Sequence, residues 1–98
     1  MIIRIVKLTF KENGAEEFLR LFNERKKEIR HYAGCLHLEV WREEGNPNVI
    51  FTYSHWESEE ALNNYRYSDF FRDTWSQAKP HFAEKAQAWS VTREIVVE

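Results

Sequence analysis

Hydrophobic and polar side chains alternate over residues 2–10, which is the pattern of a β-strand. One face of this strand would carry Val6 and Leu8 together with Arg4, and the other would carry Ile3 and Ile5. Both faces are therefore partly apolar, which is typical of a strand that is covered on both sides.

A helical period follows the turn at residues 11–14 and predicts a helix from about Ala15 to Tyr32. Its apolar stripe consists of Phe18, Leu21, Phe22, Ile29 and Tyr32. Asn13, followed three residues later by Glu16, resembles a capping box at the start of this helix. Gly34 is free to take the left-handed conformation that ends a helix.

Two further strands are predicted at residues 35–43 and 49–54, joined by a hairpin loop rich in Gly, Asn and Pro. The first of them would direct Cys35, His37, Glu39 and Trp41 to one face. The second would run antiparallel to it.

The octapeptide from His55 to Leu62 links the third strand to a second helical region. Ser58 is a favourable N-cap, because its hydroxyl can accept a hydrogen bond from an unpaired amide of the first turn. Trp56, just before the cap, is placed to hold the helix against the sheet. The helical pattern continues to about Lys79, with a break at residues 67–69 where Ser68 provides a new cap.

Residues 89–97 form the last predicted strand, so the order of elements is β-α-β-β-α-β. This order predicts an α+β, ferredoxin-like fold: a four-stranded antiparallel sheet with two helices on one face. We expect residues 1–98 to form a single domain. Because two helices cover only one face, the apolar side chains of the other face predict a homodimer formed through the sheet.

Composition narrows the possible partners. The net charge is −2 and no basic stripe is present, so we do not expect a nucleic-acid partner. No apolar run approaches the roughly 20 residues of a membrane span. The single cysteine, Cys35, cannot form an intrachain disulfide, which together with the absence of a signal peptide favours the cytoplasm.

Candidate chemistry lies mainly in aromatic residues, which make up 15% of the chain. Tyr65, Phe71 and Trp75 are predicted to face the sheet, where they either fill the interior or line a flat pocket for a planar ligand. His37 could act as a base if its strand face lines a cavity, and otherwise it is a packed or interfacial histidine. No set of residues has a metal-binding spacing, and the isolated glycines cannot form a phosphate loop.

The junction at residues 51–62, the segment Tyr67-Ser68-Asp69-Phe70-Phe71 and Gly34-Cys35-Leu36 resemble the antibiotic biosynthesis monooxygenase family. The resemblance implies a dimeric α/β barrel and oxygen chemistry on electron-rich aromatic or quinol substrates, often without metal or flavin. Trp56 matches the junction tryptophan of the family's aromatic polyketide monooxygenases, whereas Thr52 stands where those proteins have asparagine.

The family also includes haem-degrading members, whose functional Asn, Trp and His fall on Val6, Tyr65 and Trp75 here. The leading hypothesis is therefore a monooxygenase that needs no cofactor and acts on a planar aromatic substrate in a helix–sheet cleft. His37 and Tyr65 are its candidate catalytic residues, and Trp56, Phe71 and Trp75 would shape the pocket. The alternatives are a non-catalytic dimer that binds a small ligand and, third, a haem-binding protein.

Overall fold

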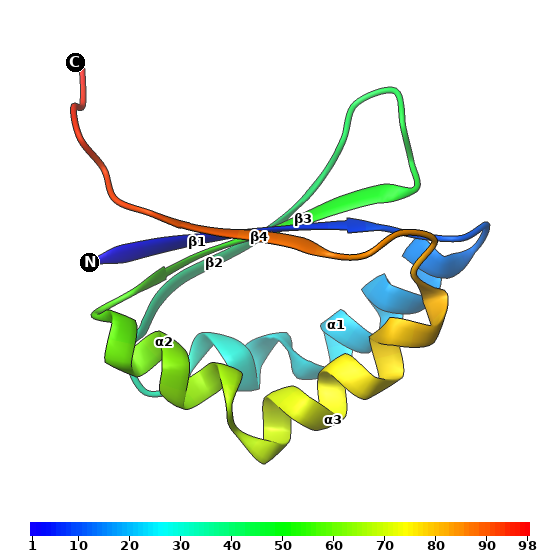
Figure 1. The fold of residues 1–98 in the computed structure, drawn as a ribbon, viewed down its shortest axis with the longest axis horizontal. Helices are drawn as coiled ribbons and strands as arrows, with labels where there is room; N and C mark the ends of the chain where they lie inside the picture. The colour runs from blue at the N-terminus through cyan, green and yellow to red at the C-terminus, as the bar shows by residue number, and fades with distance from the viewer.

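The structure is a computed structural model that describes residues 1–98 (Figure 1). Its elements in chain order are β1 (Ile2–Thr9), α1 (Gly14–Arg30), β2 (Cys35–Arg42), β3 (Val49–Trp56), α2 (Glu59–Arg66), α3 (Asp69–Ala78), a 3-10 turn (Lys79–His81) and β4 (Gln87–Val91). The predicted break of the second helical region is confirmed, since α2 and α3 are separate helices. Pro80 lies in the 3-10 turn that ends α3.

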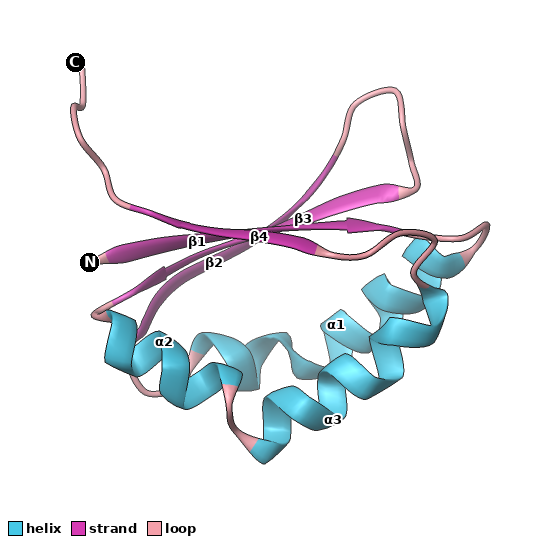
Figure 2. Ribbon diagram, in the orientation of Figure 1, coloured by secondary structure: helices cyan, strands magenta, loops and turns pink.

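The four strands form one antiparallel sheet in the order β2-β3-β1-β4, and all three helices cover the same face of it (Figure 2). This arrangement confirms the predicted α+β, ferredoxin-like fold. The central strands β1 and β3 pair over their full lengths, from Ile2 opposite Trp56 to Thr9 opposite Val49. We call the face that carries the helices the covered face and the opposite one the open face.

The interior contains two separate buried clusters. The larger cluster joins α1 to the sheet and consists of Leu8, Phe10, Ala15, Phe18, Leu21, Ile50 and Ala78. The smaller cluster joins α2 to the ends of β2 and β3 and consists of Cys35, Trp56 and Leu62. Trp56 is only 1% exposed, so the predicted role of this residue in holding the second helical region against the sheet is confirmed.

The junction between β3 and α2 is fixed by capping and by close packing. The Ser58 hydroxyl accepts a hydrogen bond from the Ala61 amide at 3.1 Å, as predicted for an N-cap. Gly34 has a φ of +87°, and a Cβ at this position would lie 2.4 Å from the Cβ of Ala61. Only glycine therefore allows the turn between α1 and β2 to pass this close to α2.

Three local predictions are wrong. Asn13 adopts a left-handed backbone conformation and makes no side-chain capping bond, so the proposed capping box does not form. A bulge between Cys35 and His37 turns Cys35 into the smaller buried cluster, and Cys35 therefore does not share the face of His37. The last strand spans Gln87–Val91 rather than 89–97, because the chain beyond Val91 has no neighbouring strand with which to pair.

The segment after Val91 leaves the sheet on the side away from the helices (Figure 1). Its apolar residues Ile95, Val96 and Val97 are 80%, 64% and 88% exposed. The open face also exposes large apolar side chains, with Trp41 at 39%, Trp89 at 44% and Val91 at 41%. The predicted surplus of apolar surface on this face is therefore present.

Candidate functional site

A cleft of about 430 Å³ lies between the helices and the covered face of the sheet, and 14 of its 19 lining residues are hydrophobic. Members of both buried clusters line the cleft, which therefore lies between the larger and the smaller cluster. Its sheet side is built partly from small side chains, namely Val6, Thr52, Ser54, Ala86 and Ala88. Because these side chains stop short of the helices, the space under α2 and α3 stays open.

A continuous row of aromatic rings lines the cleft, beginning with Trp56 at the end of β3 and continuing over α2 and α3. Tyr65 stacks on Trp56 with ring centroids 4.9 Å apart and meets Phe71 edge-on at 5.1 Å. Phe71 then stacks on Trp75 at 5.7 Å. The structure therefore brings four of the five predicted site residues together, and they line an open cleft rather than a filled interior.

Tyr65 is the only phenol in this row, and its pKa is strongly shifted. Burial raises the pKa of Tyr65 well above its ordinary value, and the neighbouring Cys35 and Tyr32 raise it further. The phenol is therefore neutral near pH 7 and can donate a hydrogen bond, but it cannot serve as a ready base. Ser54 adds a hydroxyl on the sheet side, where its Oγ accepts a hydrogen bond from Trp56 Nε1 at 2.9 Å.

Two arginines also line the cleft, Arg4 from β1 and Arg66 from the last turn of α2. Arg4 Nη1 donates to Ser90 Oγ at 3.0 Å, and the Arg66 guanidinium lies over the Tyr67 ring at 5.6 Å. Burial lowers the pKa of Arg4, and the positive charge of Arg66 lowers it further. Strand alternation predicts that Arg4 shares a face with Val6 and Leu8, but Arg4 was not among the predicted site residues.

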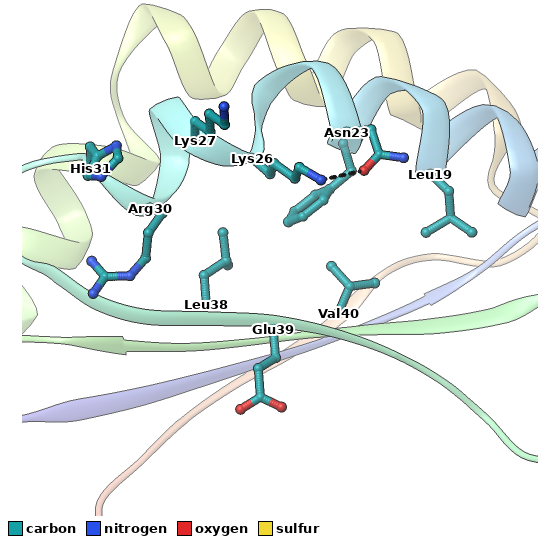
Figure 3. Close-up of a pocket in the computed structure, with 10 residues that line it drawn as sticks. Leu19, Asn23, Lys26, Lys27, Arg30, His31, Leu38, Glu39 and Val40 are labelled. Atoms are coloured by element: carbon teal, nitrogen blue, oxygen red, sulfur yellow. Dashed lines mark hydrogen bonds between the residues drawn. The ribbon is translucent and has the colours of Figure 1, made fainter.

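His37 lies on the open face and does not line the cleft. The alternation along β2 explains this placement, because Leu38 and Val40 point towards α1 while Glu39 points away from it (Figure 3). The expected meeting of His37 with Tyr65 in one site therefore does not occur. No histidine, cysteine or methionine lines the cleft, so tyrosine, as Tyr65 and Tyr67, is the only residue type there that can serve as an axial ligand of haem.

On the open face, His37 belongs to a polar network surrounded by aromatic rings. Its Nε2 lies 2.5 Å from Glu39 Oε2, and Trp41 Nε1 donates to Glu39 Oε1 at 2.9 Å. The hydrogen bonds from Trp41 and His37 lower the pKa of Glu39. His55 lies beside His37, with ring centroids 5.1 Å apart; burial, and then the charge of His37, lower the pKa of His55.

A second hollow of about 370 Å³ lies between α1 and the edge strand β2 (Figure 3). Its rim carries the basic residues Lys26, Lys27, Arg30 and His31. Lys26 Nζ donates to Asn23 Oδ1 at 3.1 Å, and Arg30 Nη1 donates to the Cys35 carbonyl at 2.9 Å. This hollow has no aromatic wall comparable to that of the cleft, and no group of side chains in the structure is arranged to hold a metal ion.

The chain belongs to the antibiotic biosynthesis monooxygenase family, whose family profile matches residues 1–86. No curated protein sequence matches the chain. None of the helices is both long and apolar enough to cross a membrane.

Solved structures share the fold at low sequence identity. A crystal structure of an antibiotic biosynthesis monooxygenase superimposes with a TM-score of 0.89 at 16% identity, covering 97% of this chain and 100% of the other. A conserved protein from Methanosarcina mazei Go1 gives a TM-score of 0.87 at 22% identity, over 96% and 94% of the two chains. Rv0793 from Mycobacterium tuberculosis gives 0.87 at 11% identity, over 99% and 98%.

Proposed function

We propose that this protein is a cofactor-independent monooxygenase that oxidises a small planar aromatic or quinol substrate in the helix–sheet cleft. The observation that carries the proposal is the open cavity of about 430 Å³ beneath a row of aromatic rings. Ligand pockets generally have volumes of roughly 300–1,000 Å³ and mostly apolar walls, so the cleft has the size and character of a binding site. Membership of a monooxygenase family supplies the reaction class.

In this proposal the substrate ring lies along the row formed by Trp56, Phe71 and Trp75. The neutral Tyr65 phenol donates a hydrogen bond to a substrate oxygen, and the apolar walls exclude water. For an anthrone-type substrate, the CH₂ group loses a proton and reacts with O₂. It becomes a carbonyl that contains one oxygen atom, and the other oxygen leaves as water with the two hydrogens.

A non-catalytic, ligand-binding role is the second candidate, and one observation favours it. No histidine, aspartate, glutamate, lysine or cysteine lines the cleft, so the cleft contains no ordinary general base. Either the substrate loses its proton without such a base, or the cleft binds a ligand and leaves it unchanged.

Oxygen uptake in the presence of anthrone separates these two roles. We expect uptake and anthraquinone formation above the uncatalysed background, and loss of both in an Ala88→Trp variant. Ala88 lines the cleft from the exposed edge strand β4, so an indole there would occupy the cleft without disturbing the core. Anthrone binding without uptake would favour the binding role, and the absence of both would contradict the proposal.

We also propose that two copies pair through their open faces into a homodimer. The exposed Trp41, Trp89 and Val91 on this face, together with the half-buried Phe51 and Tyr53, form an apolar surface that monomers rarely leave uncovered. A twofold axis would bring the same residues of both copies together. The mass in solution, measured by light scattering across a concentration series, tests this pairing.

A further inference from the structure

Four of the eight arginines form ion pairs with carboxylates, and none of these four lines the cleft. These ion pairs join Arg20 to Glu17, Arg25 to Asp73, Arg42 to Glu16 and Arg72 to Asp69, whereas Arg30 and Arg93, also outside the cleft, form none. Neither Arg4 nor Arg66 forms an ion pair, although both are only partly exposed. The cleft therefore holds two cations and no anion.

This arrangement is unfavourable in the empty protein. Arg4 is partly removed from water, and its sole hydrogen bond to another residue is to the neutral hydroxyl of Ser90. The two guanidinium groups lie near enough for the charge of Arg66 to act on Arg4. Partly desolvated like charges repel each other and attract an anion more strongly than charges in open water do.

The position of the two arginines within the cleft limits the kind of anion. Arg4 lies on the sheet side of the cleft, opposite Ser54 and Ser90 in the strand register. Arg66 lies on the helix side, one residue after Tyr65 in α2. An anionic group held between them would be attached to a body that lies along the aromatic row. Guanidinium groups bind planar oxyanions through paired N–H···O hydrogen bonds.

We propose that Arg4 and Arg66 bind an oxyanion carried by a planar aromatic ligand. This inference rests on the proposed function, since it names the substrate class of the same cleft. The oxyanion is either a carboxylate substituent on the ring or the phenolate or enolate oxygen of the ring system itself. In the second case the arginines lower the pKa of the substrate, which accounts for a cleft that can promote proton loss without containing a general base.

Isothermal titration with 2-naphthoate and its neutral counterpart 2-naphthamide tests the recognition of a carboxylate. We expect the wild-type protein to bind 2-naphthoate about ten-fold or more tightly than 2-naphthamide, because hydrogen bonds from a guanidinium to a carboxylate are stronger than those to a neutral amide. The Arg66→Gln variant should lose much of this preference, and the Arg4→Gln, Arg66→Gln double variant should lose all of it. Arg72→Gln, on the outer surface of α3, is the matched control and should keep the preference.

Titration of bound 2-naphthol tests the recognition of a ring oxyanion, because its near-ultraviolet absorption spectrum reports ionisation of the ground state. We expect the wild-type protein to lower the pKa of bound 2-naphthol by about one unit or more and the double variant to restore it. An anion preference in either assay that disappears in the double variant supports the inference. Arg66→Gln, at the partly exposed end of α2, keeps the test available if Arg4→Gln does not fold.

The outcomes separate this inference from the proposed function. If 2-naphthamide and 2-naphthoate bind equally well and the pKa of 2-naphthol does not move, the cleft is an aromatic site but the arginines do not select an anion. If a preference persists in the double variant, another group is responsible and the inference is wrong. If no naphthalene compound binds at all, the proposed function fails as well.

Discussion

The covered and open faces of the sheet are built from the same four strands, yet they differ in what they bring together. Two of the four tryptophans lie on each side of the sheet: Trp56 of β3 and Trp75 of α3 line the cleft, whereas Trp41 and Trp89 belong to the open face. The covered face combines aromatic rings with arginines, and the open face combines aromatic rings with His37, His55 and Glu39. A one-residue step along a strand therefore moves a side chain from the covered face to the open face.

Aromatic content alone does not distinguish the two faces. On the covered face, small sheet residues such as Ser54 and Ala88 leave room opposite the aromatic row, and a cavity results. On the open face, Trp41 stacks directly on Tyr53 at 4.5 Å, so the rings cover one another and present a flat surface. A cavity suits a small ligand, and a flat apolar surface suits a second copy of the chain.

Truncating one tryptophan on each face should give the largest effect and the sharpest contrast. Trp56→Ala should lower the free energy of unfolding by about 3–5 kcal/mol, because this ring is 1% exposed and packs against Tyr65. Trp89→Ala removes a ring that is 44% exposed and should cost less than half as much. Urea unfolding of both variants at the same low concentration measures the difference, and equal losses would contradict the assigned faces.

A charge in the middle of the open face should disrupt pairing with little effect on the cleft. Ile5 lies between Tyr53 and Trp89 in the strand register, so Ile5→Asp would bury a carboxylate between two copies. We expect the dissociation constant of the dimer to rise by about 100-fold, because an unpaired buried charge costs several kcal/mol. Sedimentation velocity over a concentration range provides the measurement.

Asn46→Asp is the control for that experiment, since it adds the same charge in the β2–β3 loop and keeps the oxygen that accepts from the Asn48 amide. It should leave the dimer intact. If Ile5→Asp behaves like this control, the open face is not the subunit interface.

Removing the Tyr65 hydroxyl should have a smaller effect, confined to the covered face. Tyr65→Phe keeps the ring that stacks on Trp56 and removes only the proposed hydrogen-bond donor. We expect kcat for anthrone oxidation to fall about ten-fold with KM little changed, as for loss of one hydrogen bond formed mainly in the transition state. Tyr53→Phe on the open face is the matched control, and an equal fall in both variants would rule out a specific role for Tyr65.

Acidification should produce the smallest effect, and it should come from the open face. The pKa of His55 is lower in the folded protein than its ordinary value of 6.5, so the native state favours the neutral ring. Its contribution to stability is complete above pH 6.5 and is lost as the pH falls from there through the lower folded pKa. The groups that act on it are His37, Glu39 and Arg93.

Urea unfolding at pH 7.5 and pH 5.5 would show a modest loss of stability on acidification. His55→Gln should reduce that loss, and His81→Gln, in the 3-10 turn after α3, should not. A wild-type protein that becomes more stable at the lower pH would contradict the sign of the effect. Glu39, whose folded pKa is also lowered, would add a further loss at pH values below the range of this comparison.

The sequence predicted most of the fold because local signals agreed with the global arrangement. Strand alternation placed Arg4, Val6 and Leu8 on one face, and Ser58 and Ser68 accept the expected capping bonds. The errors occurred where a tertiary effect intervened. The bulge after Cys35 depends on the pairing of β2 with β3, and the end of β4 depends on the length of its neighbour β1.

The candidate site was predicted in part for a similar reason. Helical spacing identified Tyr65, Phe71 and Trp75 as inward-facing, but whether such rings fill or line a space depends on the volumes of the opposing strand residues, which lie far away in sequence. His37 was grouped with the cleft because a sequence does not show which strand face the helices cover. The arginines of the cleft were not predicted as site residues. The signal that could have revealed them is Arg4, a charged residue on the same strand face as the apolar Val6 and Leu8.

The indole N–H signals of the four tryptophans provide the most direct test of an aromatic ligand site on the covered face. In a nitrogen-15 NMR titration with 2-naphthol, the signals of Trp56 and Trp75 should shift with ligand concentration, and those of Trp41 and Trp89 should stay in place. Shifts confined to Trp41 and Trp89, or no shift in any of the four at saturating ligand, would contradict the account.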